Sequence, residues 1–113
     1  MQLYDYDAVV EQHLAAEPVD YTRYPCVSPG FDNSPRRPER GATIITGGTP
    51  ARYERWLRTA TERFRPPSAE ENLVFVNAWN EWAEGNHLEP DRRWGRAYLD
   101  VHARLSSVLA SSR

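Results

Sequence analysis

The chain has 113 residues, enough for one small domain and too few for two ordinary ones. Its 14 basic and 16 acidic residues give a net charge of −2, which excludes the broad basic footprint of a nucleic-acid-binding protein. The single cysteine excludes an internal disulfide framework, and no apolar run approaches the ~20 residues of a membrane-spanning helix. The first seven residues are acidic and aromatic, unlike a signal or transit peptide, so we expect a cytoplasmic protein.

The N-terminal third predicts one helix and one short strand. Apolar residues recur at helical spacing between Val9 and Leu14, which predicts a leading helix over residues 7–16 that ends before Pro18. Residues 24–27 predict a short buried strand, broken by the prolines and glycine that follow. Cys26 lies in this strand, and we expect it to be a small buried residue without a nucleophilic role.

The middle of the chain predicts a brief extended segment over residues 43–45 and then a long amphipathic helix. Thr49 suits the N-cap of this helix and Pro50 its first position. An apolar stripe at helical spacing predicts the face turned to the core: Tyr53, Trp56, Leu57, Ala60 and Phe64. The Pro66-Pro67 pair ends the helix.

The last third predicts one strand and one helix. Residues 73–76 form a continuous apolar run, typical of a strand buried on both faces. From Trp94 apolar residues repeat at helical spacing to near the C-terminus. Helices and strands therefore alternate along the chain, which predicts an α/β fold with right-handed crossovers in one structural unit.

A run of acids, amides and indoles follows the apolar strand without a gap. Glu81 and Glu84 lie three residues apart, between Trp79, Asn80 and Trp82. Breaking a glycosidic bond needs one carboxylic acid at the leaving oxygen and a second carboxylate as base or nucleophile. Indoles offer flat faces to a sugar ring, and amides supply donors and acceptors to its hydroxyls. A sugar site is one interpretation; an acid-rich helix start with the tryptophans in the core is the other.

Two further polar segments are candidates for the same site. Asp32 and Asn33 follow the earlier strand, either as an Asx turn or as ligands of sugar hydroxyls. Arg36 is either part of a solvated loop or a clamp on a phosphate or a sugar carboxylate. His87 lies near Glu89 and Asp91, but this spacing matches no established zinc motif, and we expect no metal site.

Three segments resemble the C-terminal part of the WbsX-type glycosyltransferases, which are associated with bacterial O-antigen and other surface polysaccharides. These segments read YPCVSPGFDNSPRR, GGTPARYERWL and LVFVNAWNEWAEGNHLEPDRRWGRAYLD, and the resemblance covers roughly residues 21–105. The family is similar in turn to the family 99 glycoside hydrolases. The sequence departs from the family pattern at Phe31, where Trp is expected, at Cys26, and at Asn86-His87.

The resemblance implies a (β/α)8 barrel with its site at the C-terminal ends of the strands. It implies Glu81 as the base on a neighbouring 2-hydroxyl and Glu84 as the acid and then base at the leaving oxygen. Glycan or sugar-nucleotide substrates are implied, with no metal or organic cofactor. The residues expected to bind substrate are Asp32, Asn33, Arg36, Trp79, Asn80, Trp82 and His87.

The length conflicts with a complete barrel, because such a barrel takes ~250 residues. We therefore expect residues 1–113 to be the C-terminal portion of a single barrel domain, about two βα units in residues 21–113 after a leading helix in residues 1–20. Open strand edges and helices on one side only would bury a poor core, so the isolated chain is expected to be marginally stable and inactive without the N-terminal part. The alternative function is a carbohydrate-binding or structural remnant without catalysis.

Overall fold

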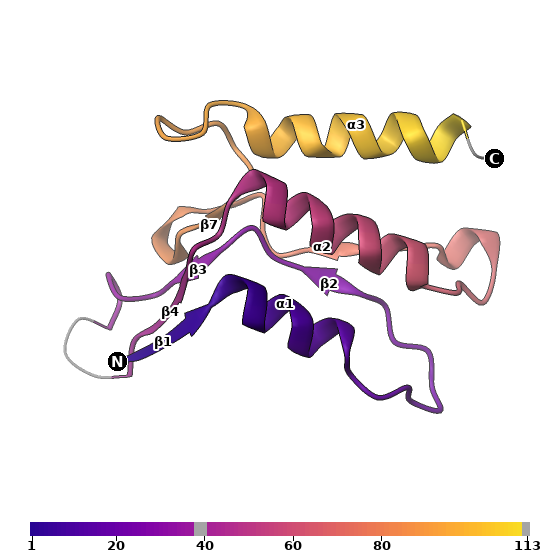
Figure 1. Cartoon of the computed structure of the whole chain (residues 1–113), viewed down its shortest axis with the longest axis horizontal. Coiled ribbons are helices and arrows are strands. Elements are labelled where there is room, and N and C mark those ends of the chain that lie inside the picture. The colour runs from indigo at the N-terminus through magenta and orange to yellow at the C-terminus, as the bar shows by residue number, and fades with distance from the viewer. Residues whose placement is uncertain (38–40, 112–113) are drawn as a thin grey trace.

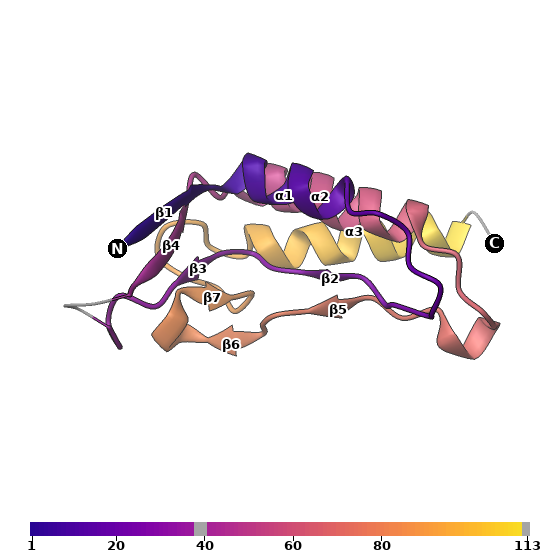
Figure 2. The same cartoon turned by 90° about the horizontal axis from the view of Figure 1, so that it is seen from below.

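The computed structural model describes residues 1–37 and 41–111. Three helices lie on one side of a layer of short strands, as Figures 1 and 2 show from two directions. The helices are α1 (Tyr6–Leu14), α2 (Pro50–Arg63) and α3 (Ala97–Ser111), with α2 in contact with both of the others. The fold is thus mixed α/β, and this part of the sequence prediction is confirmed.

The strands form three small sheets. In the first, β1 (Gln2–Asp5) pairs in parallel with β4 (Thr43–Thr46), and β3 (Phe31–Asp32) pairs antiparallel with the other edge of β4. In the second, β2 (Cys26–Val27) and β5 (Phe75–Val76) are parallel, and α2 lies between them in the chain. The third is the antiparallel pair β6 (Asn80–Glu81) and β7 (Asn86–His87). Two 3-10 turns, η1 (Ala69–Glu71) and η2 (Trp82–Glu84), complete the order.

Helix α2 forms as its sequence predicts. The Thr49 side chain accepts a hydrogen bond from the Arg52 amide at 3.2 Å, and Pro50 occupies the first position. Four of the five stripe residues are buried, while Phe64 is half-buried at the C-cap. Since the opposite face carries charged residues, the helix orients itself by burying this one stripe.

The core lies between the helices and the strands. Tyr6, Val10, Val27, Tyr53 and Val101 have no exposed surface. The buried hydroxyl of Tyr6 donates to the Ser28 carbonyl at 2.7 Å, and the hydroxyl of Tyr53 lies 2.7 Å from Nε2 of His102. Burial raises the pKa of both tyrosines, so they remain neutral donors at pH 7.

The helix boundaries need correction, and four strands, β1, β3, β6 and β7, were missed. The leading helix begins at Tyr6 and ends at Leu14, and strand β1 precedes it. All four residues of β1 are exposed, so no buried apolar face marks it in the sequence. The last helix starts at Ala97 and not at Trp94, because residues 91–95 form a turn closed by hydrogen bonds between Asp91 and Gly95.

The prediction that residues 73–76 are buried on both faces is wrong. Only Phe75 and Val76 are in a strand, and Leu73 and Phe75 remain 46% and 54% exposed, while Val74 and Val76 pack against the core. The prediction that Cys26 is buried was also wrong, because Cys26 is exposed and lies directly across from Phe75 in the paired strand. The helices cover one face of β2 and β5, and we call the other face, with Cys26, Leu73 and Phe75, the open face.

Candidate functional site

The acid-rich segment forms a compact loop after β5. Strands β6 and β7 pair with each other, and η2 and Gly85 reverse the chain between them. Gly85 has a φ of +55°, and a Cβ there would lie 3.3 Å from the Cβ of Asp32. The loop therefore packs closely against β3, so two segments that are fifty residues apart in the chain meet at one place.

Arg36 bridges the two glutamates of this loop. Its guanidinium donates to Oε1 of Glu81 and to Oε1 of Glu84, both at 3.2 Å. The glutamate side chains are 40% and 25% exposed, so both carboxylates remain open to solvent and ligands. The structure thus brings together three of the predicted site residues, and Arg36, although 55% exposed in its turn, forms ion pairs within the chain.

Asp32 and Asn33 build the turn that presents Arg36. The Asp32 carboxylate accepts from the Ser34 amide at 2.9 Å, which confirms the predicted Asx turn. The Asn33 side chain accepts from the Thr43 amide at 2.7 Å, and its carbonyl accepts from the Arg36 amide. These two residues therefore act locally on the backbone, beside the acid pair.

The two tryptophans of the loop lie at the surface, so the interpretation of residues 77–85 as a helix start with a tryptophan core is wrong. Trp79 and Trp82 are 52% and 49% exposed. The indole of Trp82 stacks on the His87 ring with centroids 3.6 Å apart, and its N–H donates to Glu89 at 2.9 Å. Asn80 is exposed as well. One face of Trp82 is thus already covered by the chain itself.

His87 connects this stack to the turn before α3. Its Nε2 lies 3.0 Å from Oδ2 of Asp91, whose Oδ1 accepts from the Trp94 amide at 2.6 Å. Burial acts to raise the pKa of Asp91, but the hydrogen bonds from Trp94 and His87 outweigh it and lower the pKa below its ordinary value. Asp91 is therefore a fixed, charged carboxylate.

Asn86 is a residue of the loop that sequence reasoning did not assign a role. It is fully buried, and its side-chain oxygen accepts from the Ala78 amide at 2.8 Å and from the Ser28 hydroxyl at 3.1 Å. These bonds tie both ends of the loop to the end of β2. The only signal in the sequence was a departure from the family pattern at this position.

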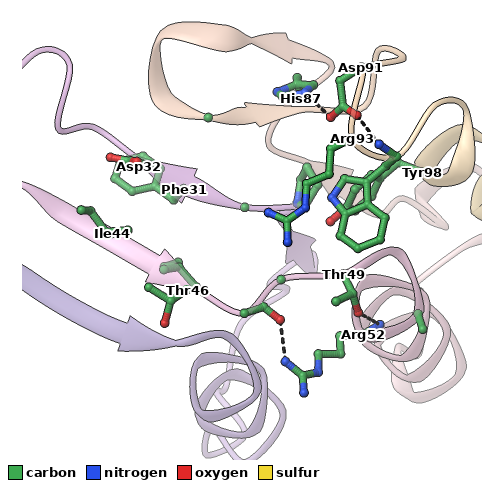
Figure 3. Close-up of a pocket in the computed structure, with 18 residues that line it drawn as sticks. Phe31, Asp32, Ile44, Thr46, Thr49, Arg52, His87, Asp91, Arg93 and Tyr98 are labelled. Carbon is green, nitrogen blue, oxygen red and sulfur yellow. Dashed lines mark hydrogen bonds and ion pairs between the residues drawn. The ribbon is translucent and has the colours of Figure 1, made fainter.

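A cavity of about 730 Å³ adjoins the acid pair, and we call it the side cavity (Figure 3). Its walls come from β3, β4, the Gly47–Thr49 loop, the start of α2 and the segment from Asp91 to Tyr98. Asp32, Gly85 and His87 line it, whereas Glu81 and Glu84 do not. The acid pair and the side cavity are neighbouring features that share Asp32.

Within the described ranges, no three His, Cys, Asp or Glu side chains gather in a way that could hold a metal ion. His87 and Asp91 bond to each other, while Glu89 bonds to Trp82. No helix in the same ranges is long and apolar enough to cross a membrane.

The two glutamates follow the parallel strand β5, and the carboxyl end of a parallel strand is where α/β proteins commonly bind their ligands. The chain belongs to the WbsX glycosyltransferase family, whose model, described as "Glycosyltransferase WbsX", matches residues 1–102. Family membership confirms the resemblance found in the sequence, and it indicates a carbohydrate-active role.

Two relatives described as "Uncharacterized protein WxcX" come from strain B100 and a second strain of Xanthomonas campestris pv. campestris. Each is 52% identical to this chain over 83 residues, a match that covers 73% of this chain and 12% of the relative. The chain therefore spans only a small part of these relatives. No solved structure matches it.

Proposed function

We propose that this chain carries the catalytic carboxylates of an enzyme that makes or breaks glycosidic bonds in bacterial surface-polysaccharide metabolism. The observation that carries the proposal is the Arg36 guanidinium bridging Glu81 and Glu84, which holds two partly exposed carboxylates side by side. Two such groups in one place are what glycosidic chemistry requires. Family membership supports the class of substrate.

In this proposal the two glutamates divide the proton transfers between them. Glu81 takes the proton of the neighbouring 2-hydroxyl as its oxygen bonds to the anomeric carbon, while the glycosidic bond breaks and Glu84 gives its proton to the leaving oxygen. Glu84 then takes a proton from the incoming group, whose oxygen bonds to the anomeric carbon and displaces the 2-oxygen, and Glu81 returns its proton to that 2-oxygen. The same acid pair serves hydrolysis and transfer, since only the incoming group differs. Trp79 and Trp82 offer exposed indole surface to a sugar ring, and Asn80 offers its amide to hydroxyls.

We further propose that residues 1–113 are the C-terminal portion of a (β/α)8 barrel whose remainder lies in the preceding part of a longer protein. Helices cover only one face of the strands, and the open face is apolar along β5 but leads into the acid pair beyond it. A barrel wall has this arrangement, with packed side chains inside and the site at the strand ends. The small share of the relatives that the chain spans is consistent with this.

The barrel proposal is tested by the thermal unfolding of the 113-residue chain. A broad transition with self-association is expected, since the open face has nothing to cover it. A cooperative transition of a monomer, measured by calorimetry together with sedimentation, would contradict the proposal.

The catalytic proposal is tested by turnover of fluorogenic glycosides and sugar nucleotides by the gene product that carries this chain. Glu81→Gln and Glu84→Gln are each expected to lower turnover by about 10²–10⁴-fold, because each removes a proton-transferring group. Glu70→Gln is the matched control: Glu70 is exposed and lies in η1, before β5 and outside the loop. Full turnover in both glutamate variants would refute the assignment.

The second candidate function is glycan binding without catalysis, and the half-exposed Trp79 and Trp82 favour it. It predicts that the wild-type protein binds glycans but turns over neither class of substrate. It also predicts that Trp79→Ala weakens binding, whereas Glu84→Gln leaves binding within about twofold. Detectable turnover by the wild type decides in favour of the enzyme.

A further inference from the structure

The side cavity is lined by Arg93, an exposed residue whose guanidinium forms no ion pair within the described part of the chain. Figure 3 shows Arg93 extending from the turn before α3 into the space between β3 and the Gly47–Thr49 loop. Its guanidinium carbon lies 4.9 Å from the centre of the Trp94 ring. Within residues 1–37 and 41–107 it forms no ion pair, so its N–H groups face the cavity while the indole holds its plane.

The other charged groups of the cavity wall are already engaged. Arg52 pairs with Asp7 at 3.3 Å and donates to the Gly47 carbonyl at 2.6 Å. Both oxygens of Asp91 accept, one from the Trp94 amide and the other from His87. Among the residues that the structure describes, the polar groups of the wall without a hydrogen bond include the guanidinium of Arg93, the second carboxylate oxygen of Asp32, whose Oδ1 accepts from the Ser34 amide, and the buried Nδ1 of His87.

The walls between these groups suit a sugar ring. Trp94, Tyr98 and Phe31 are all among the lining residues, and the volume lies within the range of ordinary ligand pockets. Burial raises the pKa of Tyr98 to about 12, so at neutral pH its ring brings no negative charge to the cavity. A ligand that fits must offer hydroxyls to Asp32 and a negative group to Arg93.

We propose that the side cavity binds an anionic sugar residue of the substrate, with Arg93 holding its oxyanion and Asp32 accepting from a hydroxyl. The oxyanion is the carboxylate of a uronate or the phosphate of a sugar phosphate, since the guanidinium fork binds both in the same way. This inference rests on the proposed function in taking the ligand as part of the same glycan. It adds that the glycan is acidic.

Every residue that lines the cavity belongs to this chain, and the binding test uses the gene product that carries it, as the turnover test does. Glucuronate, glucose 1-phosphate and neutral glucose are titrated against it by NMR at low ionic strength. At least one anionic probe is expected to saturate the shifts of residues in the cavity wall, at least tenfold more tightly than glucose. Glucuronate alone would identify a uronate as the ligand, and glucose 1-phosphate alone would identify a sugar phosphate.

The variants separate a specific site from surface charge. Arg93→Gln is expected to weaken the binding of the anionic probe at least tenfold. Arg93→Lys is expected to weaken that binding less. Arg96→Gln is the matched control, because Arg96 is exposed on the same segment but does not line the cavity. It is expected to change affinity less than twofold. Asp32→Asn is expected to weaken binding severalfold.

Three results would overturn the proposal: no saturable binding of either anionic probe, glucose binding as tightly as the anions, or equal losses in the Arg93 and Arg96 variants. The outcome is separable from that of the turnover assay, which depends on Glu81 and Glu84. If Glu81→Gln abolishes turnover and the anions do not bind, the cavity proposal alone fails. If the anions bind and no turnover is found, the catalytic proposal alone fails.

Discussion

The two sides of the strand layer use aromatic residues in different ways. On the helical side, Tyr6 and Tyr53 are fully buried and Trp56 almost so, and the two phenol hydroxyls have partners. On the open face, Phe75 is about half exposed, and so is Trp79 in the loop beyond β5. The buried residues on the helical side form the core that stabilises the chain. The open side keeps its apolar surface available for a ligand or for the rest of a larger protein.

The arginines repeat this difference. Near the helices each paired arginine meets one acid from another helix, as in Arg104 with Glu54 and Arg55 with Glu11. At the loop beyond β5, Arg36 meets two acids at once. Single exposed pairs add little to stability, whereas one cation between two carboxylates fixes their positions. The comparison separates residues that hold the fold from residues that hold the site.

The largest difference in unfolding free energy is expected between two tryptophan-to-alanine variants, one in the core and one at the surface. Trp56→Ala removes a buried ring that packs edge-on against Tyr6, with centroids 5.9 Å apart, and is expected to cost about 3–5 kcal/mol of unfolding free energy. Trp79→Ala removes a ring that is half in solvent and is expected to cost less than about 1 kcal/mol. Urea unfolding of both variants measures the contrast. Equal losses would mean that the open side is part of the core.

Local sequence signals were sufficient for the helical side. The N-cap, the proline at the first position and the apolar stripe of α2 are all short-range features, and each has the predicted role. The alternation of helices and strands was enough for the α/β class. Strand β1 could not be found this way, because it is exposed and is held by backbone pairing with β4, forty residues later.

The sequence singled out the candidate site residues, but it did not predict their contacts. The motif drew attention to Glu81 and Glu84, but nothing local indicated that Arg36 lies between them, since these pairs span more than forty residues. The prediction that residues 73–76 are buried on both faces was wrong for a related reason. Periodicity cannot distinguish a strand covered on both faces from one whose second face stays open.

A smaller effect on unfolding free energy is expected when the pH is lowered, through His102 on the helical side. Burial lowers the pKa of His102, whose Nε2 lies 2.7 Å from the Tyr53 hydroxyl. Below the ordinary histidine pKa of about 6.5, the unfolded chain takes up a proton that the folded chain resists. The contribution of His102 to the free energy of unfolding is therefore fully present above that pH, and it is lost as the pH falls below it.

Urea unfolding at pH 7.5 and pH 5.5 checks this. His102→Gln should flatten the difference between the two pH values, while His13→Gln, a change at an exposed histidine, should keep it. A wild-type chain that is equally stable at both pH values would show that protonation of His102 does not destabilise the core.

The smallest effect on stability is expected at Arg36. Its two ion pairs are exposed, so Arg36→Gln should change the unfolding free energy by no more than about 1 kcal/mol. The same change should lower turnover more strongly, since Glu81 and Glu84 would no longer be held at a fixed spacing. Arg37→Gln, a change at the exposed neighbour, is the matched control for charge.

A double-mutant cycle between Arg36→Gln and Glu84→Gln sharpens the distinction between fold and site. A coupling below about 1 kcal/mol in unfolding, together with strong coupling in turnover, assigns the bridge to the site. Strong coupling in unfolding alone would instead make the bridge a clasp between β3 and the loop, and the two sides of the molecule would then differ less than their burial indicates. The cycle therefore tests the comparison at the one cluster where stability and function meet.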